Sequence, residues 1–366
     1  MGFVKAAMKM NWKERCCIAA VVALTAMPGA NTREPEPDTL RYGSVKQEVV
    51  NARLQEYGGD NKQREATLKK LFQEAGCDEE HLSEQTVKGS KQPNVICLLP
   101  GRNGRALIVG AHFDRVSEGD GVVDNWSGAS LLPSLYQSLK TAEREHTYIF
   151  VGFAEEEEGE VGSRFYVHQM SKEAIATTDA MVNMDTLGLG PTQVWESHSD
   201  KQLAGALAYI AKRLELPAGN VNVEQVGSSD SEQFAEKKIP CITVHSLTQK
   251  TWDERILHSS KDNMTAMKLD DYYQTYRLLA AYLAFLDQLP ARSSTAEKGL
   301  RVVPGTGQKK ISDLGSVLYR HFRTPQLLKF FDLLLDLAAK LQRMSDFMKR
   351  FRGAAGAYDH DGSVAE

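Results

Sequence analysis

The chain has 366 residues, of which 42% are hydrophobic and 25% are charged, with 28 Gly and 12 Pro. These values are ordinary for a folded globular protein, and they exclude a disordered, collagen-like or coiled-coil chain as the main architecture. The 44 basic and 48 acidic residues give a formal net charge of -4, and the absence of an overall basic field argues against a nucleic-acid partner.

The N-terminus has the order of a secretory signal. Four basic residues precede an apolar run over residues 16–27, and Pro28, Gly29 and Ala30 follow it. The run is about 12 residues long, shorter than the roughly 20 that span a bilayer as a helix. We therefore predict a signal peptide over residues 1–30 and export to the periplasm or the cell exterior. A membrane anchor formed by an uncleaved signal is the alternative, and no later segment is apolar enough to span.

The rest of the chain divides into three parts by composition. Residues 31–43 are rich in Pro and charge and are expected to form a linker. A folded domain is expected over residues 44–290. Residues 291–366 are expected to form a helical C-terminal extension with a disordered tail, whose apolar stripe packs on the domain or on a second copy; attachment to a membrane surface is the alternative.

Cysteine usage excludes a disulfide scaffold. Two of the five cysteines fall in the predicted signal peptide, which leaves Cys77, Cys97 and Cys241. These three allow one bridge and one free thiol, and the sequence does not select the pair.

Apolar runs of strand length alternate with helix-like segments in the predicted domain. Two amphipathic helices are expected between residues 44 and 77. The later alternation predicts an α/β fold with a mostly parallel, mixed central sheet and helices on both faces. The expected strands are Asn94–Leu99, Ala106–Ala111, Thr147–Phe153, Ala180–Met184, Gln193–Glu196 and Pro240–Val244. The expected helices are Ser127–Leu139, Asp200–Leu214, Ser231–Lys237 and Leu269–Leu289.

Polar residues gather at the predicted strand ends, where ligand sites lie in such folds. They are His112 and Asp114, Asp124 before the first helix of the alternation, the Glu run at residues 155–158, Asp185, and His258. Two imidazoles and three carboxylates can hold two zinc ions, each with one imidazole and one terminal carboxylate, while another carboxylate bridges them. Because oxygen-only ligands would suit magnesium or calcium, the histidines favour zinc or another transition metal. We expect two Zn²⁺ per chain.

Five segments, in order, carry a family resemblance: GAHFD, VVDNWSGAS, AEEEEGEVGS, VNMDTLG and LHSSKDN. Together they resemble the motifs of the co-catalytic zinc exopeptidases of peptidase family M28, which includes secreted aminopeptidases, glutamate carboxypeptidase-like proteins and glutaminyl cyclases. The resemblance covers roughly residues 94–289 and implies that residues 44–290 form a zinc peptidase domain of that fold. It further implies one zinc on His112 and Asp185, the other on Glu157 and His258, Asp124 as the bridge, and Asp114 orienting His112.

The Glu run leaves two registers open for the general base. In the family the base is the first Glu of a pair that precedes one residue, a Gly, two residues and then Gly-Ser. Counting back from Gly159 makes Glu156 the base and Glu157 the ligand. The flanking glutamates keep open a shift by one residue, to Glu155 and Glu156. The segment at residues 228–231 also resembles a loop that borders the substrate site.

Other residues carry weaker expectations. Trp126 stands where a small residue is usual, and it either lines the pocket or packs against the sheet. His245 also ends a strand, but it lacks the following Ser-Ser-Lys-Asp, so His258 is favoured as the ligand. The remaining histidines are expected at the surface or in loops: His81, His146, His168, His198, His321 and His360.

The resemblance implies a reaction as well as a site. A water between two zinc ions would lose its proton to Glu156 and attack a peptide carbonyl, and Glu156 would then protonate the leaving amine. An aminopeptidase, which releases single N-terminal residues, is the favoured reading. A glutaminyl-cyclase-like acyltransferase, a zinc carboxypeptidase and a non-catalytic binding ectodomain are the alternatives.

Overall fold

The computed structural model describes residues 40–289. The predicted signal peptide, most of the predicted linker and the C-terminal extension lie outside these residues. Between residues 40 and 289, no helix is both long and apolar enough to cross a bilayer.

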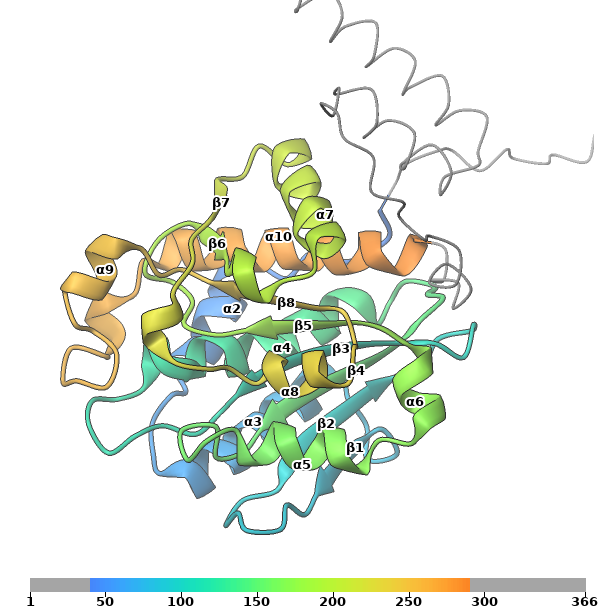
Figure 1. The fold of residues 1–366 in the computed structure, drawn as a ribbon, viewed down its shortest axis with the longest axis horizontal. Coiled ribbons are helices and arrows are strands. Elements are labelled where there is room, and N and C mark those ends of the chain that lie inside the picture. Colours follow the sequence, from blue (N-terminus) through green and yellow to red (C-terminus); the bar gives the residue numbers. More distant parts are fainter. Residues whose placement is uncertain (1–39, 290–366) are drawn as a thin grey trace, which may run out of the picture. The chain divides into compact units, whose positions relative to one another are not determined.

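The described part of the chain is built on an eight-stranded sheet (Figure 1). The strands are β1 (Leu82–Gln85), β2 (Asn94–Leu99), β3 (Ala106–His112), β4 (Thr147–Phe153), β5 (Thr178–Met184), β6 (Thr192–Val194), β7 (Ala218–Asn220) and β8 (Cys241–His245). Their order is β1-β2-β4-β3-β5-β8-β6-β7, and the four central strands β4, β3, β5 and β8 are parallel. Strand β2 pairs antiparallel with β4 and β6 with β8, which confirms the predicted mixed, mostly parallel sheet.

Alternation along the buried strands divides the core between the two faces of the sheet. In β3, Leu107 and Val109 belong to one apolar cluster and Ile108 to the other, because successive side chains point to opposite faces. The larger cluster packs helices α2 (Gln47–Leu54), α3 (Asn61–Ala75), α4 (Ser127–Leu139), α7 (Lys201–Arg213) and α10 (Leu269–Gln288). The smaller cluster packs α5 (Val161–Gln169) and α8 (Ser231–Glu236), so the predicted helices on both faces are confirmed.

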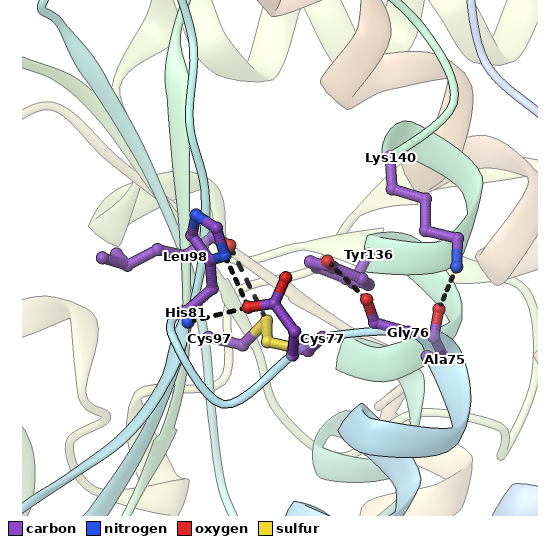
Figure 2. The surroundings of a disulfide bond; sticks show 9 residues. Ala75, Gly76, Cys77, His81, Cys97, Leu98, Tyr136 and Lys140 are labelled. Atoms are coloured by element: carbon purple, nitrogen blue, oxygen red, sulfur yellow. Dashed lines mark hydrogen bonds and ion pairs between the residues drawn. A yellow bond between two sulfur atoms is a disulfide. The ribbon is translucent and has the colours of Figure 1, made fainter.

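Helix α3 has clear end signals. Asp60 and Gln63 form a capping box at its start, and Gly76 ends it with a φ of 94°, a conformation that favours glycine. Directly after it, Cys77 forms a disulfide with Cys97 of β2, and Cys241 is a buried free thiol. Figure 2 shows the bridge beside the helix end. The structure thereby selects the pair that the sequence left open.

Several expectations are corrected. Strand β6 ends at Val194, two residues before the predicted end, because residues 196–198 turn into a short 3-10 helix. The elements not predicted are β1, β7, α5, α6 (Lys172–Thr177) and α9 (Gln249–Asp253).

His146 lies in a loop, directly before β4, which is one of the two expected places, but it is buried rather than exposed. Its side chain is only 2% exposed and lies between Asp179, 3.0 Å from Nε2, and Asp287, 3.3 Å from Nδ1. Arg105 also pairs with Asp179. The partners of His146 are 33 and 141 residues away, so no local pattern could show them.

Candidate metal centre

The side chains predicted at the strand ends come together at one edge of the sheet. His112 ends β3, Glu156 and Glu157 follow β4, and Asp185 follows β5. Asp124 lies in the turn before α4, and His258 reaches the same place from the segment after α9. The carboxyl ends of parallel strands share an edge, which is why residues so far apart in sequence converge.

Asp124 is at the centre of this cluster. His112 Nε2 lies 3.3 Å from its Oδ1, and His258 Nε2 lies 3.3 Å from its Oδ2. Each imidazole also has a second carboxylate nearby: Asp185 Oδ1 is 3.7 Å from His112 Nε2, and Glu157 Oε2 is 2.9 Å from His258 Nε2. One shared carboxylate therefore stands between two imidazole–carboxylate pairs.

The four glutamates after β4 have different surroundings. Glu156 points at the cluster, with its Oε2 3.9 Å from His112 Nε2, whereas Glu157 is paired with His258. Glu155 turns away and accepts a hydrogen bond from the Lys91 backbone amide at 2.9 Å. Glu158 is exposed. Of the four, Glu156 and Glu157 are thus the two that approach the histidines of the cluster.

Two aspartate side chains accept hydrogen bonds from backbone amides in the loops that form the cluster. Asp114 lies 3.3 Å from His112 Nδ1 and accepts hydrogen bonds from the amides of Glu156 and Glu157 at 3.1 and 3.2 Å. Asp262 accepts hydrogen bonds from the amides of Val123 and Asp124 at 2.7 and 3.1 Å. Each carboxylate thus fixes one ligand-bearing loop against another. Sequence reasoning missed the role of Asp262, although this residue stands in the segment LHSSKDN.

The turn that carries Asp124 is fixed to β5 through its neighbour. The peptide bond between Asp124 and Asn125 is cis. The Asn125 amide donates to the Met184 carbonyl at 2.9 Å and its Oδ1 accepts from Gly128 N at 3.0 Å. A Cβ at Gly128 would lie 2.6 Å from both Asn125 Oδ1 and Met184 O, so this close approach needs glycine.

The loop at residues 228–231 contacts the cluster. The Ser229 hydroxyl donates to Asp185 Oδ2 at 2.8 Å and accepts from the Asn183 amide at 2.7 Å. Asp230 is buried, and neither of its carboxylate oxygens accepts a hydrogen bond of normal geometry within the described chain. Burial raises the pKa of Asp230 to about 7; Asp185 adds to the rise, while His112 opposes it.

His245 and Trp126 are structural. The two ring nitrogens of His245 are engaged by the backbone at Val221 and Leu247, and burial lowers its pKa to about 4. The ring of Trp126 is fully buried and its Nε1 donates to the Arg53 carbonyl at 3.2 Å, so it packs and does not line the site.

The electrostatics of the cluster are those of a cation site. Burial opposes ionisation of Asp124, but the imidazoles on either side hold its pKa below the usual range. Hydrogen bonds to Asp124 and Glu157 raise the pKa of His258 to about 10. Burial raises the pKa of Glu156 well above its ordinary value, although His112 opposes the rise. Protons on the imidazoles thus balance a surplus of carboxylates, which is the task that metal ions perform in such sites.

Two sets of three residues, which share His112, each offer donor atoms that lie within 4.8 Å of one another. They are His112, Glu156 and Asp185, and His112, Asp124 and Glu157. Among the residues described, these donors combine imidazole and carboxylate groups, which suit zinc.

Known proteins are similar to the part of the chain that carries the candidate metal centre. The model of the family described as "Peptidase family M28" matches residues 94–283. "Aminopeptidase YwaD" of Bacillus subtilis (strain 168) is 28% identical over 214 residues, which are 56% of this chain and 44% of that protein. "Leupeptin-inactivating enzyme 1" of Streptomyces exfoliatus is 24% identical over 273 residues, 68% of this chain and 62% of that protein. The chain thus covers less than two thirds of either relative.

Solved structures share the fold. LapB from Legionella pneumophila superposes with a TM-score of 0.57 and 20% identity over 66% of this chain and 71% of that one. An Acidobacteriales bacterium glutaminyl cyclase has a TM-score of 0.58 and 14% identity over 69% of this chain and 98% of that one. At such identities the likeness concerns the arrangement of strands and helices.

Proposed function

The chain belongs to peptidase family M28, and from this premise we propose that it is a zinc-dependent exopeptidase acting on peptides. The observation that carries the proposal is the approach of two imidazoles to opposite oxygens of Asp124, at 3.3 Å each. A carboxylate between two imidazole–carboxylate pairs has the donor chemistry of a bridged pair of zinc ions.

The residues fit such a pair of ions. One zinc would be held by His112 and Asp185, the other by Glu157 and His258, with Asp124 shared. Glu157 Oε1 is buried and has no hydrogen-bond partner in the described part of the chain, so a ligand would satisfy it. The unbalanced carboxylates favour the same conclusion, because buried charges need a partner or a metal.

The reaction follows from the residues around this centre. Zinc, when bound, acidifies a coordinated water and polarises a carbonyl group. Glu156 faces the cluster, and within the described residues no backbone amide donates a hydrogen bond to its carboxylate. This carboxylate would accept the proton of the attacking water and return it to the leaving amine. Asp114 would keep the His112 ring in place.

We propose the aminopeptidase branch, since several relatives carry that name. The test uses zinc-loaded protein and one peptide in three forms: unblocked, N-acetylated and C-amidated. Mass spectrometry should show loss of N-terminal residues from the unblocked and amidated forms and none from the acetylated form. Cleavage of the acetylated form with protection of the amidated form would indicate a carboxypeptidase, and loss of ammonia from an N-terminal Gln peptide would indicate a cyclase.

Export remains part of the proposal, together with a signal peptide over residues 1–30, a peptidase domain over 44–290 and a helical extension over 291–366. The bridge between Cys77 and Cys97 supports it, because disulfides persist in oxidising compartments. N-terminal sequencing of cell-derived protein should find a start near Asn31; a cytosolic protein that begins at Met1 would contradict export.

A further inference from the structure

Arg64 of α3 has unusual surroundings for a buried cation. Its side chain is fully buried, and no carboxylate among the described residues lies within ion-pair distance of it. Its guanidinium donates instead to backbone carbonyls: NH1 to Phe113 at 3.2 Å, and NH2 to Asp120 at 2.5 Å and Gly121 at 2.9 Å. The Nε group donates to the Tyr57 carbonyl at 3.2 Å.

Three of these carbonyls, those of Phe113, Asp120 and Gly121, belong to two loops of the candidate metal centre. Phe113 lies between His112 and Asp114, whereas Gly121 begins the turn that leads to Asp124. The guanidinium therefore joins the end of β3 to the turn of the shared carboxylate. A rigid fork with several donors suits this task, because it can bond two loops at once.

The loop that leads to Asp124 is in turn hydrogen-bonded to the segment that carries His258. The amide of Asp120 donates to the Asp262 carbonyl at 2.7 Å, and the Asp262 side chain binds the amide of Asp124. On its other side the Arg64 guanidinium lies 5.5 Å from the centroid of the Trp126 ring. Contacts on both sides thus leave the guanidinium little freedom to move.

Charge supports the same role. Burial and the nearby Arg115 lower the pKa of Arg64 to about 10, while Asp262, Asp114 and Asp124 oppose the decrease. The side chain remains a cation at neutral pH, and it stands behind the carboxylates that face the centre. Truncation of Arg64 would free the loops and also leave several buried carbonyl groups without donors.

We propose that Arg64 is a positioning residue for the metal centre, which sets the separation between His112 and Asp124 through their backbones. The inference rests on the proposed zinc site. Arg64 lies outside the segment matched by the family, residues 94–283, so the N-terminal helices contribute to the site as well as to the core.

The test compares zinc affinity with fold stability. Arg64→Met keeps length and apolar volume but removes the donors, and Arg64→Lys keeps the charge but replaces the fork with one ammonium. Arg53→Met is the control, since Arg53 is also buried but its guanidinium bonds Ser134 and Gln137 of α4. Zinc dissociation constants come from competition with a chromophoric chelator, and the free energy of unfolding is measured on zinc-free protein.

We expect Arg64→Met to weaken zinc binding by about 10-fold to 100-fold, the range found for residues that support ligands, and Arg64→Lys to weaken it by a smaller factor. Arg53→Met should lower stability and leave zinc affinity within about 2-fold of the parent chain. Equal zinc affinity in the parent and a folded Arg64→Met, or equal weakening by Arg53→Met, would overturn the inference. If Arg64→Met does not fold, parent-like zinc affinity in Arg64→Lys overturns it. A parent chain that binds no zinc would instead refute the proposed function itself.

Discussion

Removal of the disulfide between Cys77 and Cys97 should cost stability mainly through the unfolded chain. The two cysteines are 20 residues apart in sequence, and the chain-entropy relation for a loop of that length gives about 3 kcal/mol at 25 °C. A domain of ordinary stability has about 5–15 kcal/mol in total, so this loss is large but leaves a folded protein.

The native contacts around the bridge explain why the fold should survive. The end of α3 is held by other bonds: Lys140 Nζ donates to the Ala75 carbonyl at 2.6 Å, and the Tyr136 hydroxyl donates to the Gly76 carbonyl at 3.1 Å (Figure 2). The folded state of Cys77→Ala/Cys97→Ala should therefore stay close to that of the parent. Arg64 lies 13 residues earlier in the sequence, about 20 Å along the helix, so zinc content should not change.

The assay is urea unfolding of zinc-saturated protein followed by tryptophan fluorescence. Cys241→Ala is the control, because Cys241 is a buried thiol without a bridge and its removal measures the loss of one buried sulfur. The free energy of unfolding of the double variant should fall by about 3 kcal/mol more than twice the decrease in Cys241→Ala. Its dependence on urea concentration should be steeper, because the unfolded chain without the bridge is more expanded. An excess below about 1 kcal/mol would refute the loop-entropy reasoning.

Three further predictions concern the centre and the buried ion network. Glu156→Gln should retain zinc and lower kcat by about 10²-fold to 10⁴-fold, because an amide cannot accept the proton. Glu157→Gln should lower zinc stoichiometry, and the reverse pattern, with Glu155→Gln inactive but fully loaded, would establish the shifted register. Asp262→Asn should weaken zinc binding by about 10-fold in chelator competition, since one of two acceptors for backbone amides becomes a donor; unchanged binding would contradict the clamp between the loops. Although burial opposes the rise, hydrogen bonds to two carboxylates raise the pKa of His146 from an ordinary 6.5 to about 9. The stability that its protonated form contributes is therefore complete below pH 6.5 and is lost as the pH rises through 9. The loss is on the order of 3 kcal/mol in all. Urea unfolding at a series of pH values should show this decline in the parent and a flatter profile in His146→Asn; parallel profiles would refute it.

The sequence predicted the central elements because burial on both faces imposes long apolar runs. Strands β2 and β4 and helix α4 begin and end at the predicted residues. Short edge elements were missed: β1 (LSEQ) has a polar, half-exposed sequence, and β7 has only three residues. Such segments form strands because a neighbour offers free backbone groups, which residue type does not encode.

The candidate site was predictable to the extent that its chemistry lies in side chains near strand ends. His112, Asp124 and Asp185 stand beside elements that periodicity reveals, and their types indicate a metal. Residues that act on backbone groups are less visible. Arg64 is one Arg in an amphipathic helix, and only the folded chain shows that its donors meet carbonyl groups about 50 residues away.

The strand order determines which strands can pair while the chain is still being synthesised. Strands β6 and β7 are made before β8, yet β6 joins the sheet only through β8, which lies between β5 and β6. Chains emerge from the ribosome N-terminus first, so β6 and β7 cannot join the sheet before residues 241–245 have been made. His258 and Asp262 follow directly, and the second imidazole arrives only after the last strand. A nascent chain can thus hold a partial set of donors, but the proposed hydrolytic centre is completed only after the last strand has been made.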